Sequence, residues 1–378
     1  MHLSFFYYNY TIKNFLWGEF MALSCGLIGL PLTGKTTFFN LLTGAQQTTS
    51  AFSSGKTAAS TGHVLVPDSR IDYLSALFKP KKTTYAQLEI IDIPGLIHGA
   101  GNEFLTAVRE TDALAHIVRG FENDDVLHIE DSIGVMRDID AVAAELLLAD
   151  LQLIETRLQR IQGGAKKKLE HPLEEAALEK CQTFLLNEQP LSALTFTEEE
   201  QEALKHITFL TTKPLLIVVN LDEDQFSSGN WLQKEQVEKY CSIQGYELLP
   251  ISARLEEEIS RLPVEERGLF LDELGITESG VSRLSRALYR QLGLVSFLTA
   301  GTDEVKAWTI KSGLPAKLAA GKIHSDIERG FIRAETVAFS HLEESGSMAA
   351  AREKGYFRLE GKTYPVQDGD IINFRFNI

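Results

Sequence analysis

Hydrophobic residues along this chain fall into short runs bounded by turn residues, and the runs alternate with segments in which apolar positions recur at helical spacing. Alternation of this kind is typical of βαβ units, in which helices cover a mostly parallel sheet. The strands expected in that sheet lie at residues 23–28, 88–91, 114–118, 215–219 and 246–251. The pattern therefore predicts an α/β fold.

A different pattern separates the third expected strand from the fourth. Apolar residues there recur with the alternating spacing of four and three that marks the seam between packed helices. They are Leu147, Leu151, Ile154, Leu158 and Ile161. Thr197 followed by Glu200 has the form of a capping box, which predicts a further helix running to about Leu210. Residues 138–210 are therefore expected to be an all-helical insertion, with charged faces typical of solvated helix surfaces.

From about residue 293 the pattern changes to short alternating strands separated by turn signals, which predicts a small β-rich domain over residues 293–378. The α/β domain would then comprise residues 21–137 and 211–292. Residues 1–20 are aromatic-rich but lack a basic start, an uninterrupted apolar core and a small-residue cleavage site. We expect them to be a peripheral extension or a start-site artefact, with Met21 as the natural start.

Composition narrows the possible partners of a chain of 378 residues. The formal net charge of −15 argues against broad coating of nucleic acid, because such binding depends on Lys and Arg neutralising phosphates. Any RNA contact should be local, and neither a DNA partner nor a membrane partner is expected. The three cysteines are widely spaced, which favours neither a disulfide framework nor a zinc site and fits a cytoplasmic protein.

The segment after the first expected strand carries the most specific motif, G-x-x-x-x-G-K-[ST]. Its residues are Gly29, Leu30, Pro31, Leu32, Thr33, Gly34, Lys35 and Thr36. The glycines let backbone N–H groups turn inward around phosphates, and the helix that follows adds the positive end of its dipole. Lys35 would neutralise the β- and γ-phosphate oxygens, and the Thr36 hydroxyl would bind Mg²⁺. Thr37, at the start of that helix, completes the expected phosphate-binding set.

A second acidic group should hold the metal from the end of a neighbouring strand. Asp92 stands at the end of the strand expected at 88–91, and Gly95 follows it. We expect Asp92 to be the Mg²⁺ ligand and the N–H of Gly95 to sense the γ-phosphate, with a switch loop after it. Thr57 is a candidate Mg²⁺ ligand in the first switch.

The loop that should read the base departs from the usual GTPase motif Asn-Lys-x-Asp. Asn220 and Leu221 are followed by an aspartate and then by Glu223, so the lysine is missing and the last carboxylate is one methylene longer. The longer side chain puts the carboxylate out of register for guanine, which predicts a loss of guanine preference. An ordinary acidic loop is the alternative interpretation. Ser252 and Ala253, after the next strand, match a further element of the GTPase set.

With these residues, the chain resembles the Obg-like ATPases of the YchF type, a branch of the translation-factor-related class of P-loop NTPases that prefers ATP. Segments 303–309, 321–324, 330–335 and 366–370 are similar to the TGS domain of that family. The resemblance implies a P-loop NTPase domain with a mostly parallel sheet, an inserted α-helical coiled-coil domain and a C-terminal β-grasp (ubiquitin-like) TGS domain that works with the ribosome.

The resemblance also assigns roles to two residues and shows where the chain diverges. Leu96 lies where many GTPases have a catalytic Gln, which implies slow hydrolysis. His116 lies where a substitute catalytic His has been proposed in the family, although the residues alone favour a satisfied core histidine. Segment 51–57 lacks the cysteine of the family's first switch, and the glycine-rich stretch after Gly95 is shorter, so the chain reads as a divergent paralogue.

These features predict a slow, Mg²⁺-dependent ATPase whose nucleotide state controls its association with the ribosome or ribosomal RNA, through the TGS and helical domains. GTP should bind more weakly than ATP. The alternatives are a nucleotide-gated ribosome- or RNA-binding module with incidental hydrolysis, and a GTPase. Between residues 306 and 333 basic residues outnumber acidic ones, which favours a local RNA-binding face, although a solvated face is the simpler interpretation. The basic residues are Lys306, Lys311, Lys317, Lys322, Arg329 and Arg333.

Overall fold

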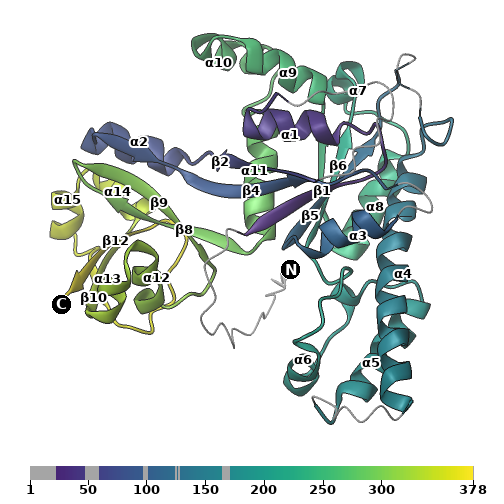
Figure 1. The fold of residues 1–378 in the computed structure, drawn as a ribbon. Helices are drawn as coiled ribbons and strands as arrows, with labels where there is room; N and C mark the ends of the chain where they lie inside the picture. Colours follow the sequence, from purple (N-terminus) through teal and green to yellow (C-terminus); the bar gives the residue numbers. More distant parts are fainter. Residues whose placement is uncertain are drawn as a thin grey trace, which may run out of the picture.

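The computed structural model describes residues 23–46, 59–96, 101–123, 126, 128–163 and 171–377. It has three parts (Figure 1): a central α/β domain, a helical arm, and a C-terminal domain on the opposite side from the arm. The predicted extension at residues 1–20 lies outside the described residues, as does Met21.

The central sheet has six strands in the order β2-β4-β1-β5-β6-β7. Five of them run parallel and match the five strands expected from the sequence. They are β1 (Ser24–Ile28), β4 (Ala86–Asp92), β5 (Ala113–Arg119), β6 (Leu215–Asn220) and β7 (Glu247–Ile251). The sixth, β2 (Ser60–Val66), pairs antiparallel with β4 and was not predicted. It is a half-exposed edge strand in which only Val64 and Val66 are buried, so its apolar signal is weak.

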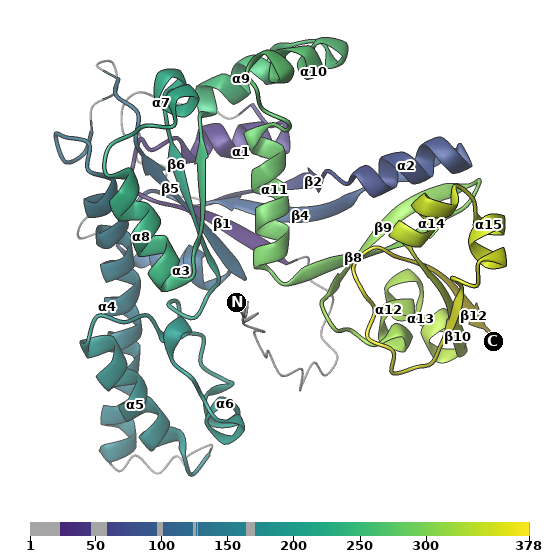
Figure 2. The same ribbon diagram turned by 180° about the vertical axis from the view of Figure 1, so that it is seen from behind.

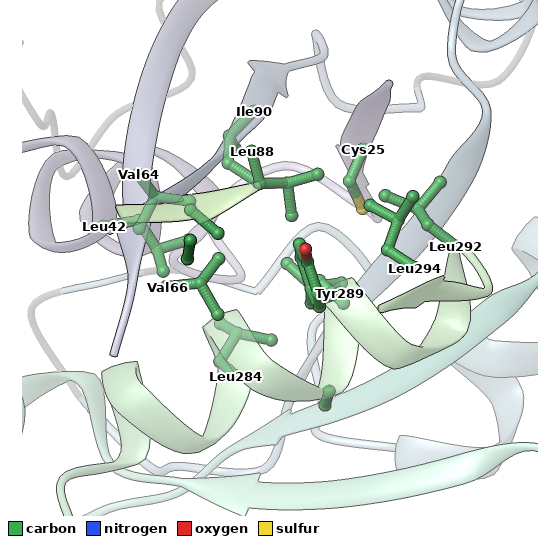
Figure 3. Packing of buried hydrophobic residues seen from close by; sticks show 14 of the residues in the cluster. Cys25, Leu42, Val64, Val66, Leu88, Ile90, Leu284, Tyr289, Leu292 and Leu294 are labelled. Atoms are coloured by element: carbon green, nitrogen blue, oxygen red, sulfur yellow. The ribbon is translucent and has the colours of Figure 1, made fainter. Parts of the chain in front are cut away.

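Helices cover both faces of this sheet. On one face α1 (Lys35–Thr43) and α11 (Gly280–Gln291) pack on side chains of β1, β2 and β4 (Figure 3). On the other face lie α3 (Gly101–Arg109), α8 (Lys234–Gln244) and the first turns of α4 (Val135–Gln162). The loops after β6 and β7 continue into α7 (Glu223–Ser228) and α9 (Ala253–Arg261), and α10 (Val264–Glu273) follows α9.

The arm is built on α4, a helix of 28 residues that spans about 42 Å at 1.5 Å per residue. Beyond the sheet it packs against α5 (Glu174–Leu186), with η1 (Leu191–Ala193) and α6 (Glu198–Leu204) completing the arm. The capping box at Thr197 and Glu200 is present, as predicted. The predicted extension of this helix to Leu210 is wrong, because the chain must turn back toward β6. Leu210 instead donates its N–H to the Asp150 carboxylate of α4.

The C-terminal sheet has the order β11-β10-β12-β8-β9-β3. Its own strands are β8 (Leu294–Ala300), β9 (Glu304–Lys311), β10 (Phe331–Ala338), β11 (Arg358–Glu360) and β12 (Asp370–Phe376). This domain is less purely β than predicted, since it also contains α12 (Ala316–Ile323), α13 (Ser325–Arg329), α14 (Phe339–Ser345) and α15 (Met348–Glu353). Small residues let α12 lie close under the sheet, where Ala316 and Ala320 pack near Phe297 and Phe374.

One segment of the α/β domain belongs to the C-terminal sheet. After α2 (Ser69–Phe78), strand β3 (Lys82–Thr84) pairs parallel with β9. Arg70 of α2 donates to Asp68 of its own helix cap and to Asp368 of the C-terminal domain. Both ribbon views show α2 lying along the C-terminal domain (Figures 1 and 2). The predicted domain boundaries remain a prediction, with this segment as the physical link across them.

Two further features bear on the sequence-based expectations. Among the described helices, none combines the length and the apolar character needed to cross a bilayer. The three cysteines are buried and free.

Candidate nucleotide-binding site

The loop between β1 and α1 has a backbone shape that two glycines make possible. Gly29 and Gly34 have φ angles of 141° and 98°, a region that L side chains rarely adopt. A Cβ on Gly29 would lie 2.3 Å from the carbonyl oxygen of Ile117, and one on Gly34 would lie 2.5 Å from the Asn220 amide nitrogen. The loop therefore curls tightly over the carboxyl ends of β1 and β5, and only residues without a Cβ fit at these two positions.

Lys35 and Thr36 open α1 and place their functional groups at this loop. The buried ammonium of Lys35 donates to the carbonyl oxygens of Gly29 and Leu30, at 3.2 and 2.6 Å. The hydroxyl of Thr36 donates to Oδ2 of Asp92, the last residue of β4, at 2.8 Å. A hydroxyl and a carboxylate held together beside a lysine match the few protein oxygens that Mg²⁺ takes when it also binds phosphate. The residues present thus fit a magnesium–triphosphate group.

The rest of the loop is tied to its surroundings through short contacts. The Thr33 hydroxyl donates to the Leu30 carbonyl at 3.2 Å. Gly95 lies so close that a Cβ there would be 2.8 Å from the backbone nitrogen of Pro31. Leu32 takes a φ of 61°, the one non-glycine residue of the loop with a positive φ. Thr37 lies in the first turn of α1. The predicted phosphate-binding residues are thus brought together on the loop between β1 and α1, on the first turn of α1 and at Gly95 after β4.

Leu96, at the position where the resemblance placed a Gln in other proteins, turns its side chain into the core. Its N–H donates to the Gly29 carbonyl at 3.1 Å. The side chain is 2% exposed and belongs to a buried cluster with Leu30, Ile93 and Phe104. An apolar side chain in this position can neither donate nor accept a hydrogen bond to water.

Asn220, at the end of β6, joins the phosphate loop to the loop after β7. Its amide nitrogen donates to the Thr33 carbonyl at 3.0 Å, and its amide oxygen accepts from the N–H of Ala253 at 3.1 Å. The side chain is buried, so both bonds are shielded from water. Ser252 caps α9 by accepting from the N–H of Leu255 at 3.4 Å. Asn220 therefore acts as a clamp between the phosphate loop and the start of α9, where Ser252 and Ala253 lie.

The two remaining base-loop residues behave differently from each other. The Leu221 side chain is buried in the core, and its N–H donates to the Ile251 carbonyl at 2.9 Å, so only its carbonyl can reach a ligand. Asp222 caps α7. Glu223 is the first residue of α7, and its carboxylate lies 3.1 Å from Nε of Arg254. Sequence reasoning missed Arg254, although it directly follows Ser252 and Ala253.

His116 lies on β5 beside the phosphate loop. It is 2% exposed, and its Nε2 has no hydrogen-bond partner within the described part of the chain. Burial, and then the nearby charge of Lys35, lower the pKa of His116 to about 3. The imidazole is therefore neutral near pH 7. The interpretation of a fully satisfied core histidine does not fit its Nε2 atom, which keeps its hydrogen-bonding capacity.

Thr57, the candidate first-switch ligand, lies outside the described residues, as does segment 51–57.

Comparisons with known proteins agree with this geometry. Residues 24–149 match a family model described as 50S ribosome-binding GTPase, and residues 294–377 match the YchF-GTPase_C model, described as a protein of unknown function. A relative from Bacillus subtilis (strain 168) named ribosome-binding ATPase YchF is 42% identical over 367 residues, which is 95% of this chain and all of the relative. One of the same name from Escherichia coli O157:H7 is 42% identical over 365 residues, with the same coverage. Among solved structures, the Schizosaccharomyces pombe YchF GTPase matches with a TM-score of 0.82 and 29% identity, over 96% of this chain and all of that one.

Proposed function

Because this chain belongs to the YchF family, it is a P-loop nucleotide hydrolase, and we propose that it is a Mg²⁺-dependent ATPase whose nucleotide state controls its association with the ribosome. Its relatives are named ribosome-binding ATPases, which supports both the ATPase activity and the ribosome as partner. The observation that carries it is the phosphate loop itself, curled around the Lys35 ammonium and held by the Asn220 clamp.

Each residue of the loop has a part in binding the triphosphate. Lys35 now bonds to two carbonyl oxygens of its own loop, so it is already placed where phosphate oxygens would replace those carbonyls as partners. Mg²⁺, when bound between Thr36 and Asp92, supplies charge neutralisation for the β- and γ-phosphates. Backbone N–H groups from Leu32 to Thr36, together with the N-terminus of α1, complete the cradle.

We infer the preference for ATP from the pair of Glu223 and Arg254. Recognition of guanine by this class needs a carboxylate that accepts two hydrogen bonds from the base. Here the carboxylate is one methylene longer and lies beside a guanidinium, so guanine would have to compete with Arg254 for it. Adenine does not offer the same pair of donors, so it does not need this carboxylate as an acceptor. The S. pombe relative is named a GTPase, so the affinities for ATP and GTP are the quantities to measure.

Hydrolysis should be slow, because the Leu96 side chain is buried and apolar and cannot orient the attacking water. Positioning and charge neutralisation would then supply most of the rate, as is usual in phosphoryl transfer. His116 is the candidate for the missing polar contact, since its neutral ring lies beside the loop and its Nε2 has no hydrogen-bond partner among the residues that the structure describes. This proposal treats Lys35 and His116 as the two catalytic side chains.

A titration with ATP and GTP analogues in the presence of Mg²⁺ tests the site. We expect ATP analogues to bind more tightly; equal or reversed affinities would remove the base assignment. Lys35→Ala should abolish binding, whereas Lys311→Ala, which removes an exposed lysine of the C-terminal domain, should leave the affinity unchanged. Circular dichroism of both variants separates loss of the site from loss of the fold.

The alternative function, a nucleotide-gated binding module, is favoured by one observation, the buried Leu96. Single-turnover hydrolysis with and without ribosomes distinguishes the two functions. If ATP stays intact in both mixtures while ribosome association still responds to it, the chain is a binding module rather than an enzyme.

A further inference from the structure

A cavity of about 600 Å³ runs along the helical arm, from its base toward the last turn of α4, away from the phosphate loop. We call it the basic pocket. It is bounded by one face of α4, by the last residue of α3, and by the segment 206–208 that returns from the arm toward β6. Every charged residue that lines it is basic: Arg109, Arg157 and Arg160. In a chain with a net charge of −15, such a cluster is a local reversal of sign.

The arginines of the basic pocket differ in how they are held. Arg157 is anchored, because it donates to the buried carboxylate of Glu174 on α5 and bonds to His206. Arg109 and Arg160 form no ion pair within the described residues. Arg160 is exposed, and Arg109 is half-buried. The pocket therefore keeps two guanidinium groups that are not bound to a carboxylate of the described chain.

The other lining groups point to the kind of ligand. Gln152 and Thr156 lie on the same exposed face of α4 as Arg160, two turns and one turn before it. The Gln152 amide can donate hydrogen bonds, whereas the Thr156 hydroxyl donates to the Gln152 carbonyl at 2.8 Å. Guanidinium groups match phosphate oxygens in a two-pronged geometry. No Phe, Tyr or Trp lines the pocket within the described part of the chain. The chemistry therefore favours the phosphates of a nucleic acid backbone.

We propose that the basic pocket binds the phosphate backbone of RNA on the ribosome. The proposal rests on the proposed function for the ribosome as partner and adds the contact surface and its chemistry. Phosphate contacts of this kind position a protein on RNA without reading its sequence. They also make the affinity depend on salt, because each neutralised phosphate releases counterions.

One wall of the basic pocket is connected to the nucleotide site. Arg109 ends α3, the helix that follows Gly95 and the switch segment. Phe104 and Val108 of α3 pack in one buried cluster with Leu96 and with the α4 residue Leu146. A shift of α3 on nucleotide exchange would therefore move Arg109 relative to Arg160. The pocket thus gives the nucleotide a direct route to RNA affinity.

The test compares wild type with the double variant Arg109→Gln/Arg160→Gln in binding to purified ribosomes over a series of salt concentrations, with an ATP analogue and Mg²⁺ present. We expect the affinity to fall at least about tenfold at moderate salt. The slope of log affinity against log salt should fall by about 1.4 to 1.8, because each of the two phosphates that the variant no longer neutralises contributes about 0.7 to 0.9. The control Arg261→Gln/Arg290→Gln makes the same charge change at two exposed arginines outside the pocket and should alter neither quantity.

Single variants test the connection to the nucleotide. Arg160→Gln should weaken ribosome binding by the same factor with ATP analogue and with ADP, because Arg160 does not lie on α3, the helix that follows the switch segment. Arg109→Gln should also reduce the difference between the two nucleotide states. Equal effects of Arg109→Gln in both states would overturn the connection. Nucleotide affinity measured without ribosomes should match wild type in every variant.

The remaining outcomes separate this proposal from its alternatives. Unchanged affinity and salt slope in the double variant would overturn the pocket as a contact. If polyglutamate competes with ribosomes and poly(U) RNA does not, the pocket takes an acidic protein segment and the RNA proposal is wrong. If wild type fails to bind ribosomes in every nucleotide state, the proposed function fails instead, and direct binding of poly(U) to wild type against the double variant still decides the pocket.

Discussion

Replacing Asn220 with Ala should damage the fold and the nucleotide site together. The change removes the amide that bonds to the Thr33 carbonyl at 3.0 Å and to the Ala253 N–H at 3.1 Å. Thr33 and Ala253 are buried, at 1% and 5% exposure, so water cannot freely replace the missing partner. One acceptor and one donor are left unsatisfied between two loops that the side chain had joined.

The size of the effect follows from these two bonds. A buried polar group without a partner costs about 1–3 kcal/mol, so two of them should lower the free energy of unfolding by about 2–4 kcal/mol once partial relaxation is allowed. The phosphate loop would also lose its fixed position, because Asn220 holds it against β6. If about 1.4 kcal/mol of that loss has to be recovered on binding, the affinity for ATP falls about tenfold.

Urea unfolding and ATP titration measure the two consequences on the same protein. Asn220→Asp is the informative second variant, because it keeps an acceptor for the Ala253 N–H but places a carboxylate against the Thr33 carbonyl. It should therefore bind ATP no better than Asn220→Ala. Asn230→Ala removes an exposed asparagine nearby and should change stability by less than about 0.5 kcal/mol. If Asn220→Ala matched wild type in both assays, the two hydrogen bonds of Asn220 would contribute neither to the free energy of unfolding nor to ATP affinity.

Three further predictions concern other polar groups. His116 is held neutral with its pKa lowered to about 3 by burial and then by Lys35, so the unfolded chain binds more protons below pH 6.5 and stability falls with pH; between pH 6.5 and 5 wild type should lose about 2 kcal/mol that His116→Gln does not, and identical pH profiles would refute this. Asp150 accepts from the N–H of Leu210 and from the N–H and hydroxyl of Thr211 at 2.7–2.8 Å, so Asp150→Ala should lower the free energy of unfolding by about 3–5 kcal/mol in urea, and a loss below about 1 kcal/mol would contradict it. Removing the link between domains by Arg70→Ala should cost only about 1–2 kcal/mol, because Asp368 is half exposed, and hydrogen exchange should speed up in β3 and β9; unchanged exchange there would count against the link.

How far local sequence predicts this molecule can be judged from particular elements. Three of the five parallel strands, β1, β5 and β6, are easily found because a strand buried on both faces is a continuous apolar run. The phosphate loop was found because its glycines and lysine are close in sequence and must be close in space. The capping box at Thr197 was found for the same reason, since its two partners are three residues apart. The end of that helix was misplaced because Asp150, which captures the returning chain at Leu210, lies 60 residues away.

The features that escaped sequence reasoning depend on distant neighbours. Strand β3 has too few apolar residues to give a recognisable strand pattern, and its partner β9 comes more than 200 residues later. Arg254 acquired meaning only when Glu223 was found beside it. The basic pocket draws Arg109 from α3, Arg160 from α4 and His206 from the returning segment, residues that no spacing rule connects.

The sequence by itself therefore determined the fold class, the phosphate loop and the family resemblance, since each depends on interactions within one turn, one strand or one loop. Only the tertiary structure decided that β3 joins the C-terminal sheet, that Asn220 clamps two loops and that basic side chains converge in the basic pocket beside α4. Periodicity specifies which face of an element is buried, but the packing of the whole chain decides what that face, and the polar groups beside it, will meet.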